Sequence, residues 1–214
     1  GSNEHEQVSV PVLSNPIQIS SGGYHSCAID DTGIVCWGRN QHGQSNSPAL
    51  ANPKKLSLGA GHSCALSDIE LICWGDNLLG QTAVPNLSMP VYVATGSRHS
   101  CAIDNSGLVC WGWNENGQIS VPDLDNPKKV SLGDRHSCAI DNSGVVCWGL
   151  NHFGQGSPPE LVNPKIIALG EHHSCAMDSF GLNCWGYDHI GQTAVPELTF
   201  TFDSDNDSLP NNYE

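Results

Sequence analysis

The chain has 214 residues and a formal net charge of −14, from 8 Lys and Arg against 22 Asp and Glu. This acidity argues against a general binder of nucleic-acid backbones, which needs clustered basic residues, and against a polybasic membrane-surface protein. No apolar run approaches the roughly 18–20 residues that a membrane helix needs. With 38% apolar residues and six Trp, the composition nevertheless indicates a folded chain.

The chain opens with a short leader, residues 1–7, in which we interpret Gly1-Ser2 as a cloning remnant. From residue 8 a 37-residue period runs without a slip. The string HSCA begins at residues 25, 62, 99, 136 and 173, CWG at 36, 73, 110, 147 and 184, and Gly-Gln at 43, 80, 117, 154 and 191. These strings divide the chain into repeats 8–44, 45–81, 82–118, 119–155 and 156–192, followed by a closing segment 193–198. A fixed period of this size indicates a propeller, a solenoid or an array.

Each repeat has the pattern of short β-strands, as the fourth repeat illustrates. Residues 128–132 alternate in polarity, and residues 138–140 and 145–149 are apolar runs that flank the turn sequence Asp141-Asn142-Ser143-Gly144. Two apolar runs around such a turn predict a β-hairpin. One unit cannot bury both faces, whereas units stacked around an axis can. The sequence therefore predicts an all-β, five-bladed β-propeller with three to four short antiparallel strands per blade.

The repeated pattern G-x-x-H-S-C-A-(I/L)-x-x-x-G-x-V-C-W-G-x-N-x-x-G-Q resembles the regulator of chromosome condensation repeat. In its short length it is similar to the propeller-type β-lactamase inhibitor proteins of bacteria. The resemblance covers residues 8–192 and implies a β-propeller that binds other molecules through its surface, without fixing a biochemical activity. Family members generally have about seven blades, and in the eukaryotic member the two Cys positions are ordinarily apolar.

The ten cysteines form five pairs, one per repeat and nine positions apart. Facing positions on a tight hairpin can reach disulfide geometry, so we expect one disulfide in each blade. Reduced buried thiols and zinc binding remain open as alternatives at this stage. Disulfides would place the protein in an oxidising compartment, secreted or at the cell surface. The expected pairs are Cys27 with Cys36, Cys64 with Cys73, Cys101 with Cys110, Cys138 with Cys147, and Cys175 with Cys184.

The five-fold His and Trp positions favour a structural role over a catalytic one. We expect each His to hydrogen-bond a neighbouring backbone group and each Trp of CWG to pack between blades. A catalytic site needs a nucleophile, a base and an orienting group that differ from one another, and no such motif or catalytic cofactor site stands out. We therefore expect no enzyme; a secreted hydrolase or lyase is a remote alternative.

A binding surface is expected where the repeats differ. Because strands alternate in direction, the loop before HSCA and the loop after CWG should share one face, and the hairpin turns should lie on the other. The shared face collects aromatic, Arg and aliphatic residues, types that are enriched in interface hot spots. Neutral drift in exposed loops is the alternative. The residues of this expected binding face are Tyr24, Arg39, His42, Leu79, Arg98, Trp113, Arg135, Leu150, Phe153, His172, Tyr187 and Ile190.

These observations predict a non-catalytic interaction or scaffold module that binds a partner through one variable propeller face. The partner is expected to be a protein or a glycan. A protein is preferred because the loop residues differ between blades, whereas a lectin-like propeller is expected to repeat one pocket in each blade. No nucleic-acid binding and no membrane insertion are expected. We also expect the chain to be one part of a longer protein.

An acidic tail, residues 199–214, follows the closing segment. Asp203, Asp205, Asp207 and Glu214 occupy positions 1, 3, 5 and 12 of a calcium-loop spacing. The tail resembles thrombospondin type 3 repeats, although Ser208 stands where Gly normally makes the sharp turn. The sequence thus predicts calcium binding here, with a solvated acidic tail as the alternative.

Overall fold

The computed structural model describes residues 2–196, which consist of β-strands and their connections. The expected calcium ligands Asp203, Asp205, Asp207 and Glu214 lie outside the described residues, as do positions 197 and 198 of the closing segment. Between residues 2 and 196 no helix is long and apolar enough to cross a membrane. The strands are β1 (Gln18–Ser21), β2 (His25–Asp30), β3 (Gly33–Gly38), β4 (Lys55–Leu58), β5 (His62–Leu66), β6 (Leu71–Gly75), β7 (Tyr92–Thr95), β8 (His99–Asp104), β9 (Gly107–Gly112), β10 (Lys129–Leu132), β11 (His136–Ile140), β12 (Val145–Gly149), β13 (Ile166–Leu169), β14 (His173–Asp178) and β15 (Gly181–Gly186).

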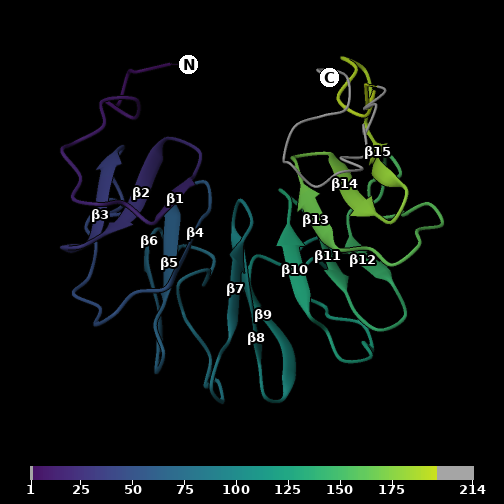
Figure 1. The fold of residues 1–214 in the computed structure, drawn as a ribbon, viewed down its shortest axis with the longest axis horizontal. Coiled ribbons are helices and arrows are strands. Elements are labelled where there is room, and N and C mark those ends of the chain that lie inside the picture. The colour runs from purple at the N-terminus through teal and green to yellow at the C-terminus, as the bar shows by residue number, and fades with distance from the viewer. Residues whose placement is uncertain (1, 197–214) are drawn as a thin grey trace, which may run out of the picture.

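The strands form five antiparallel sheets of three, each made by one repeat, and we call them blades 1 to 5. Figure 1 shows the blades following one another in chain order along an arc. The first strands of successive blades lie against each other, β1 on β4, β4 on β7, β7 on β10 and β10 on β13. The described residues give no comparable contact between β1 and β13. The predicted all-β, five-bladed propeller is confirmed, with three strands in each blade.

The hairpin turn between the second and third strands is fixed by an aspartate and a glycine, as blade 3 shows. The Asp104 carboxylate accepts hydrogen bonds from the Ser106 backbone N–H at 2.7 Å and from the Ser88 N–H at 2.7 Å. Gly107 has a φ of 123°, which a residue with a side chain adopts only with strain. These bonds make the short turn between two buried strands possible.

Each pair of cysteines sits at directly opposite positions of a hairpin. Cys64 pairs with Cys73 in the register of β5 and β6, and the S–S distance there is 2.08 Å. All five expected pairs are bonded, so no described cysteine is free. The disulfide prediction is confirmed, and the alternatives of reduced thiols and of zinc are excluded by this pairing.

The leader has the structure of the end of a repeat. The Asn3 side-chain oxygen accepts from the Val8 N–H at 3.0 Å, as Asn40 accepts from Ser45, 37 residues later. Glu6 has a φ of 61°, where the repeats have Gly. The backbone carbonyl of Gln7 accepts the indole N–H of Trp37 at 3.1 Å. Residues 3–9 therefore give Trp37 of blade 1 the carbonyl acceptor that the Trp of each later blade receives from the repeat before it.

The core lies between blades rather than within them. On blade 2, Cys64 and Leu66 are buried against Val93 and Trp111 of blade 3. The same arrangement joins the other successive blades. Since fully burying one large apolar side chain contributes about 1.5–3 kcal/mol, these interfaces are the main source of stability.

Candidate binding face

One end of the blades carries both variable loops of every repeat. In blade 1 the Arg39 N–H donates to the Tyr24 carbonyl at 2.8 Å, and in blade 3 the Trp113 N–H donates to the Arg98 carbonyl at 3.0 Å. The equivalent bond is present in all five blades. The loop before the second strand and the loop after the third strand therefore share one end, which we call the loop face. The hairpin turns lie at the opposite end, the turn face.

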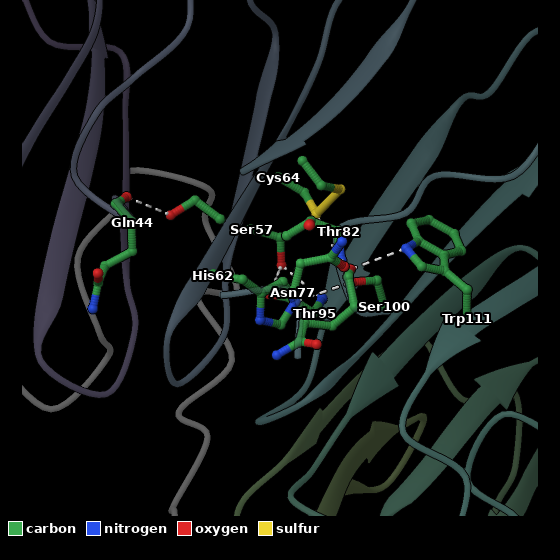
Figure 2. Close-up of a disulfide and its surroundings, with 12 residues drawn as sticks. Gln44, Ser57, His62, Cys64, Asn77, Thr82, Thr95, Ser100 and Trp111 are labelled. Atoms are coloured by element: carbon green, nitrogen blue, oxygen red, sulfur yellow. Dashed lines mark hydrogen bonds between the residues drawn. A yellow bond between two sulfur atoms is a disulfide. The ribbon is translucent and has the colours of Figure 1, made fainter. Parts of the chain in front are cut away.

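A relay of side chains that crosses from blade to blade holds the loop face in place (Figure 2). His62 Nε2 lies 3.0 Å from the hydroxyl of Ser100 in the next blade. That hydroxyl donates to the Gln81 carbonyl at 2.9 Å, and the Trp111 indole N–H donates to the same carbonyl at 3.0 Å. The expected partner of the His was a backbone group; the structure shows a serine hydroxyl 38 residues further along the chain.

The relay sets the protonation of the buried histidines. Because the serine hydroxyl donates to a carbonyl, it accepts the proton of His Nε2, which leaves Nδ1 with a bare lone pair. In four blades this Nδ1 is buried and has no hydrogen-bond partner in the described residues. Burial lowers the pKa of His25, His62 and His136 to about 4 and that of His99 to about 3. At neutral pH these side chains are therefore neutral structural elements without a titrating role.

The repeated glutamine orders the second variable loop. The Gln44 side-chain oxygen accepts the His42 N–H at 2.9 Å, and the same bond occurs in the other repeats, for example from Phe153 to Gln155. Gln44 and Gln155 are buried, whereas the side chains before them point outward. The invariant frame thus presents a different residue in each blade at the same position.

Trp113 is the centre of one cluster on the loop face. The guanidinium of Arg98 lies 5.7 Å from its ring centroid, and that of Arg135, from the next blade, lies 5.0 Å away. The Arg135 guanidinium also donates to the Asp134 carboxylate at 3.1 Å. Arginine stacked on an aromatic face keeps its in-plane N–H groups free to donate to a partner.

An aromatic cluster lies on the loops of blades 4 and 5. The ring centroids of Phe153 and Tyr187 are 4.8 Å apart, and that of His172 lies 5.5 Å from Phe153. The ring centroid of His189 lies 6.0 Å from that of Tyr187. His189 was not among the residues expected from the sequence. Phe153 remains 47% exposed, so the cluster offers apolar area to solvent.

A third cluster is formed by Tyr24, Arg39 and His5. The Arg39 guanidinium lies 5.7 Å from the Tyr24 ring centroid, and the ring of His5 meets Tyr24 edge-on at 5.5 Å. His5 was missed because it lies in the leader, although it stands one period of 37 residues before His42. The 37-residue register was the signal that could have found it.

The remaining expected residues are on the loop face but outside these clusters. His42, Leu79 and Ile190 are exposed, and Leu150 is half-buried. Leu79 is accompanied by Leu78, which is 84% exposed. The structure thus gathers eight of the twelve expected residues into three clusters and leaves these four beside them.

An opening near the axis of the arc also lies on the loop face, and its lining residues were not among those expected from the sequence. It is a cavity of about 490 Å³ lined by the loops between the first and second strands, with Gly59, Gly96 and Gly133 among its residues. A Cβ at Gly59 would lie 2.4 Å from the Gly96 carbonyl, so only glycine allows the loops to meet around the axis. Asp134 and Glu171 are the charged residues of the lining.

The geometry on the loop face is suited to binding. It combines rigid backbone, exposed aromatic rings and arginines, which are the side chains that dominate interface energies. Among residues 2–196 no group of three His, Cys, Asp or Glu side chains is arranged to hold a metal ion.

Comparison with known proteins supports the assignment of the repeats. The model of the regulator of chromosome condensation (RCC1) repeat matches residues 17–44, 91–118 and 128–155. No curated protein sequence matches the chain.

Solved structures with the same fold come from plants and yeast. The ectodomain of the receptor kinase CR4 of Physcomitrella patens has a TM-score of 0.74 and 24% identity, over 88% of this chain and 56% of that one. The CRINKLY WD40 ectodomain of the Arabidopsis thaliana receptor kinase ACR4 has a TM-score of 0.67 and 26% identity, over 85% and 66%. Prp20p of Saccharomyces cerevisiae, studied for its binding to Gsp1p and histones, has a TM-score of 0.71 and 23% identity, over 87% and 61%. The chain therefore spans less than two thirds of the length of these proteins.

Proposed function

We propose that this chain is a non-catalytic protein-interaction module of a secreted or cell-surface protein, and that it binds its partner through the loop face. The observation that carries this proposal is the contrast between an invariant frame and its variable tips. The buried relay of His, Ser, Gln and Trp recurs from blade to blade, whereas the loop residues that it presents vary, with Arg98 and Arg135 as the one repeated pair among the selected positions.

The chemistry of the tips supports a protein partner. Trp113 with its two arginines and the cluster of Phe153, Tyr187 and His172 combine aromatic area with directional donors. Such residues are enriched among those that contribute most to protein–protein affinity. A face with different side chains in each blade suits one extended, asymmetric partner better than a repeated small ligand.

The oxidised state and the relatives support the proposed location. Five disulfides persist in an oxidising compartment, and two of the similar solved structures are receptor ectodomains. Protein binding is also described for Prp20p, which shares the fold.

The experiment compares a loop-face variant with a control variant on the turn face. The first replaces Trp113, Phe153 and Tyr187 by Ala on the loop face, and the control replaces the 81% exposed Phe180 of the turn face by Ala. Immobilised protein is presented with extracellular proteins of the source, and captured proteins are identified by mass spectrometry. A partner held by the parent and by Phe180→Ala, but lost by the triple variant with an unchanged melting temperature, supports the proposal.

A partner retained by the triple variant would contradict the proposed face. A glycan array in parallel tests the lectin-like alternative, since glycan binding that survives in several blades would favour a sugar ligand.

A further inference from the structure

The five lysines of the chain all lie at the turn face, at two neighbouring positions of the repeat: Lys54, Lys128 and Lys165 share the first position, and Lys55 and Lys129 share the second. Lys54 and Lys55 precede and begin β4, and Lys128 and Lys129 precede and begin β10, two repeats later. The fifth, Lys165, directly precedes β13 of blade 5. The two pairs have the same place in the fold, so their surroundings can be compared position by position.

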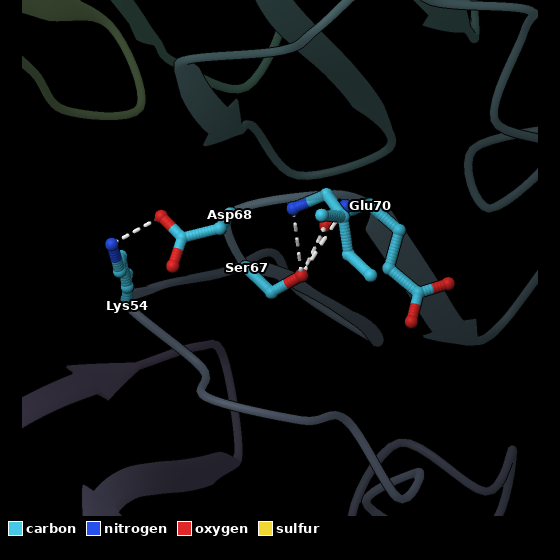
Figure 3. Close-up of polar contacts among 5 residues, drawn as sticks. Lys54, Ser67, Asp68 and Glu70 are labelled. Carbon is cyan, nitrogen blue, oxygen red and sulfur yellow. Dashed lines mark hydrogen bonds and ion pairs between the residues drawn. The ribbon is translucent and has the colours of Figure 1, made fainter.

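In blade 2 both lysine charges have partners. The Lys54 ammonium forms an ion pair with the Asp68 carboxylate on the hairpin turn (Figure 3). The Lys55 ammonium lies 3.0 Å from the ring centroid of Tyr92, in a cation–π contact. Burial, together with the positive charge of Lys129, lowers the pKa of Lys55 to about 8. Lys55 of blade 2 and Lys129 of blade 4 are thus near enough for their positive charges to repel one another.

In blade 4 both partners are replaced. Asn142 stands two repeats after Asp68, and Ile166 stands two repeats after Tyr92, so the carboxylate and the aromatic ring are both missing. Lys165 stands two repeats after Val91 and adds a third ammonium. Between residues 2 and 196, none of the three lysines of this group takes part in a salt bridge.

The three lysines line one cavity between blades 4 and 5. It has a volume of about 390 Å³, and Asn142, Ser143 and Asn163 add polar groups to its lining. Lys129 is oriented by its hydrogen bond to the Lys165 carbonyl at 2.6 Å and retains two further N–H donors. The groove therefore concentrates ammonium and amide donors in a chain whose net charge is strongly negative.

The single carboxylate of this groove is already occupied. Asp141 accepts hydrogen bonds from the Asp125 N–H, from the Ser143 N–H and hydroxyl, and from the Gly144 N–H. The Asp141 carboxylate is thus engaged in the hydrogen bonds of the hairpin turn. Within the described residues it forms no salt bridge with a lysine. Three lysines thus line the groove together with one engaged carboxylate.

The equivalent grooves of other blades differ in charge. The groove between blades 1 and 2 has Lys54 as its one basic residue, beside Asp30 and Asp31. The groove between blades 2 and 3 is mostly apolar and has Glu70 as its charged residue. The basic lining of the groove between blades 4 and 5 therefore differs from that of these two grooves and does not follow from the repeat itself.

We propose that the groove between blades 4 and 5 binds a tetrahedral oxyanion, a sulfate or phosphate group, through Lys128, Lys129 and Lys165. A tetrahedral oxyanion offers acceptors in several directions, which suits three ammonium donors and the amides of Asn142 and Asn163. The anion takes the place that Asp68 and Tyr92 fill in blade 2. The site lies at the opposite end of the blades from the loop face and is independent of the proposed function.

The test is a titration followed by isothermal calorimetry and by backbone NMR shifts. The probes are sodium sulfate, sodium phosphate and N-acetylglucosamine 6-sulfate, each against sodium chloride of equal ionic strength. The double variant Lys128→Gln/Lys165→Gln is compared with the matched control Lys54→Gln/Lys55→Gln. We expect the first to weaken anion binding by about tenfold or more and the control to change it by less than about twofold.

Shifts at residues 140–144 and 163–165 that saturate with either free anion support a site for the free ion, and shifts with the sugar sulfate alone support an ester-bound ligand. Equal losses in the two variants, or equal shifts with sodium chloride, would overturn the proposal. Urea midpoints of both variants establish that each remains folded.

Discussion

The residues between successive blades and the equivalent residues on the outer sides of blades 1 and 5 are nearly the same in sequence. Their surroundings differ, because the outer residues have no neighbouring blade within the described residues. Cys27, Cys64, Cys101 and Cys138 are completely buried because the next blade covers them. Cys175, at the same position in blade 5, is partly exposed, and its neighbour Met177 is 37% exposed. The burial of a residue in this fold is therefore decided by the neighbouring blade and not by the repeat that contains it.

The same contrast holds at the other end. Leu56, on the first strand of blade 2, is 3% exposed, whereas Ile19, 37 residues earlier in blade 1, is 63% exposed. Ser63 accepts from His25 of the blade before it, whereas the Ser26 hydroxyl bonds Ser21 within its own blade. Identical positions thus allow the contribution of a neighbour to be measured directly.

The largest expected effect comes from truncating an apolar side chain between blades. Leu56→Ala should lower the free energy of unfolding by about 4–5 kcal/mol, because it opens a cavity in the core shared by blades 1 and 2. Ile19→Ala should cost less than about 1 kcal/mol, since most of that side chain is already in water. Urea denaturation of both variants measures the difference. Equal losses would contradict the view that neighbouring blades supply the stability.

Removal of a disulfide should have the next largest effect. Each disulfide joins residues nine apart, and the chain-entropy model assigns such a loop about 2–3 kcal/mol. Cys64→Ala/Cys73→Ala should lose this contribution and about 1 kcal/mol more, because Cys64 packs against Val93 and Trp111. Cys175→Ala/Cys184→Ala should lose only the cross-link. Denaturation under non-reducing conditions measures the free energy of unfolding of both variants. A larger loss in Cys175→Ala/Cys184→Ala than in Cys64→Ala/Cys73→Ala would contradict this expectation.

The buried histidines should make stability depend on pH. Their folded-state pKa values of about 3 to 4 lie below the ordinary value of 6.5, so the unfolded chain binds more protons between these values. The stabilisation is complete above pH 6.5 and is lost as the pH falls from 6.5 towards 4, by at most about 1.4 kcal/mol per pH unit for each histidine.

His99→Gln should make this slope shallower, because it removes one buried imidazole while retaining a donor for Ser137. His173→Gln is the matched control, since His173 has no serine of a following blade within the described residues. Urea midpoints measured between pH 4 and 7.5 give the slopes. A parent protein with no loss of stability in this window would rule out the proposed neutral relay.

The smallest effect concerns reduction rates. Limited treatment with a thiol reductant should open Cys175–Cys184 before the four disulfides that a following blade covers, because the attacking thiolate needs access to sulfur. Alkylation of the released thiols and peptide mapping would establish the order. Cys101–Cys110, completely buried at Cys101, is the internal reference.

The parts of the fold that depend on one repeat could be predicted from sequence. The pairing of Cys64 with Cys73 follows from a hairpin whose turn and strands are adjacent in the chain. The common face of Tyr24 and Arg39 follows from the alternation of strand direction. Both inferences need only local geometry.

The packing of the CWG Trp between blades was predicted, and Trp111 confirms it, but the individual partners across two blades could not be predicted. The partner of His62 is Ser100, which lies in the next blade, and no pattern within one repeat indicates that contact. Trp113 meets Arg135 only because successive loops converge on the axis. The lysine groove has Asn142 at the repeat position that Asp68 occupies in blade 2. The effect of this difference on the lysines can be recognised only when the contacts of both residues are known.

The succession of contacts, each from one blade to the next, has a consequence for how the chain folds. Every step of the relay joins residues about one repeat apart, so each interface closes a loop of similar and moderate length. Folding can therefore nucleate at any pair of blades and propagate in both directions, as in a one-dimensional lattice of coupled units. Amide protons of β7 and β8, at the centre of this series, should exchange most slowly, and protection should decline by steps towards β1 and β15.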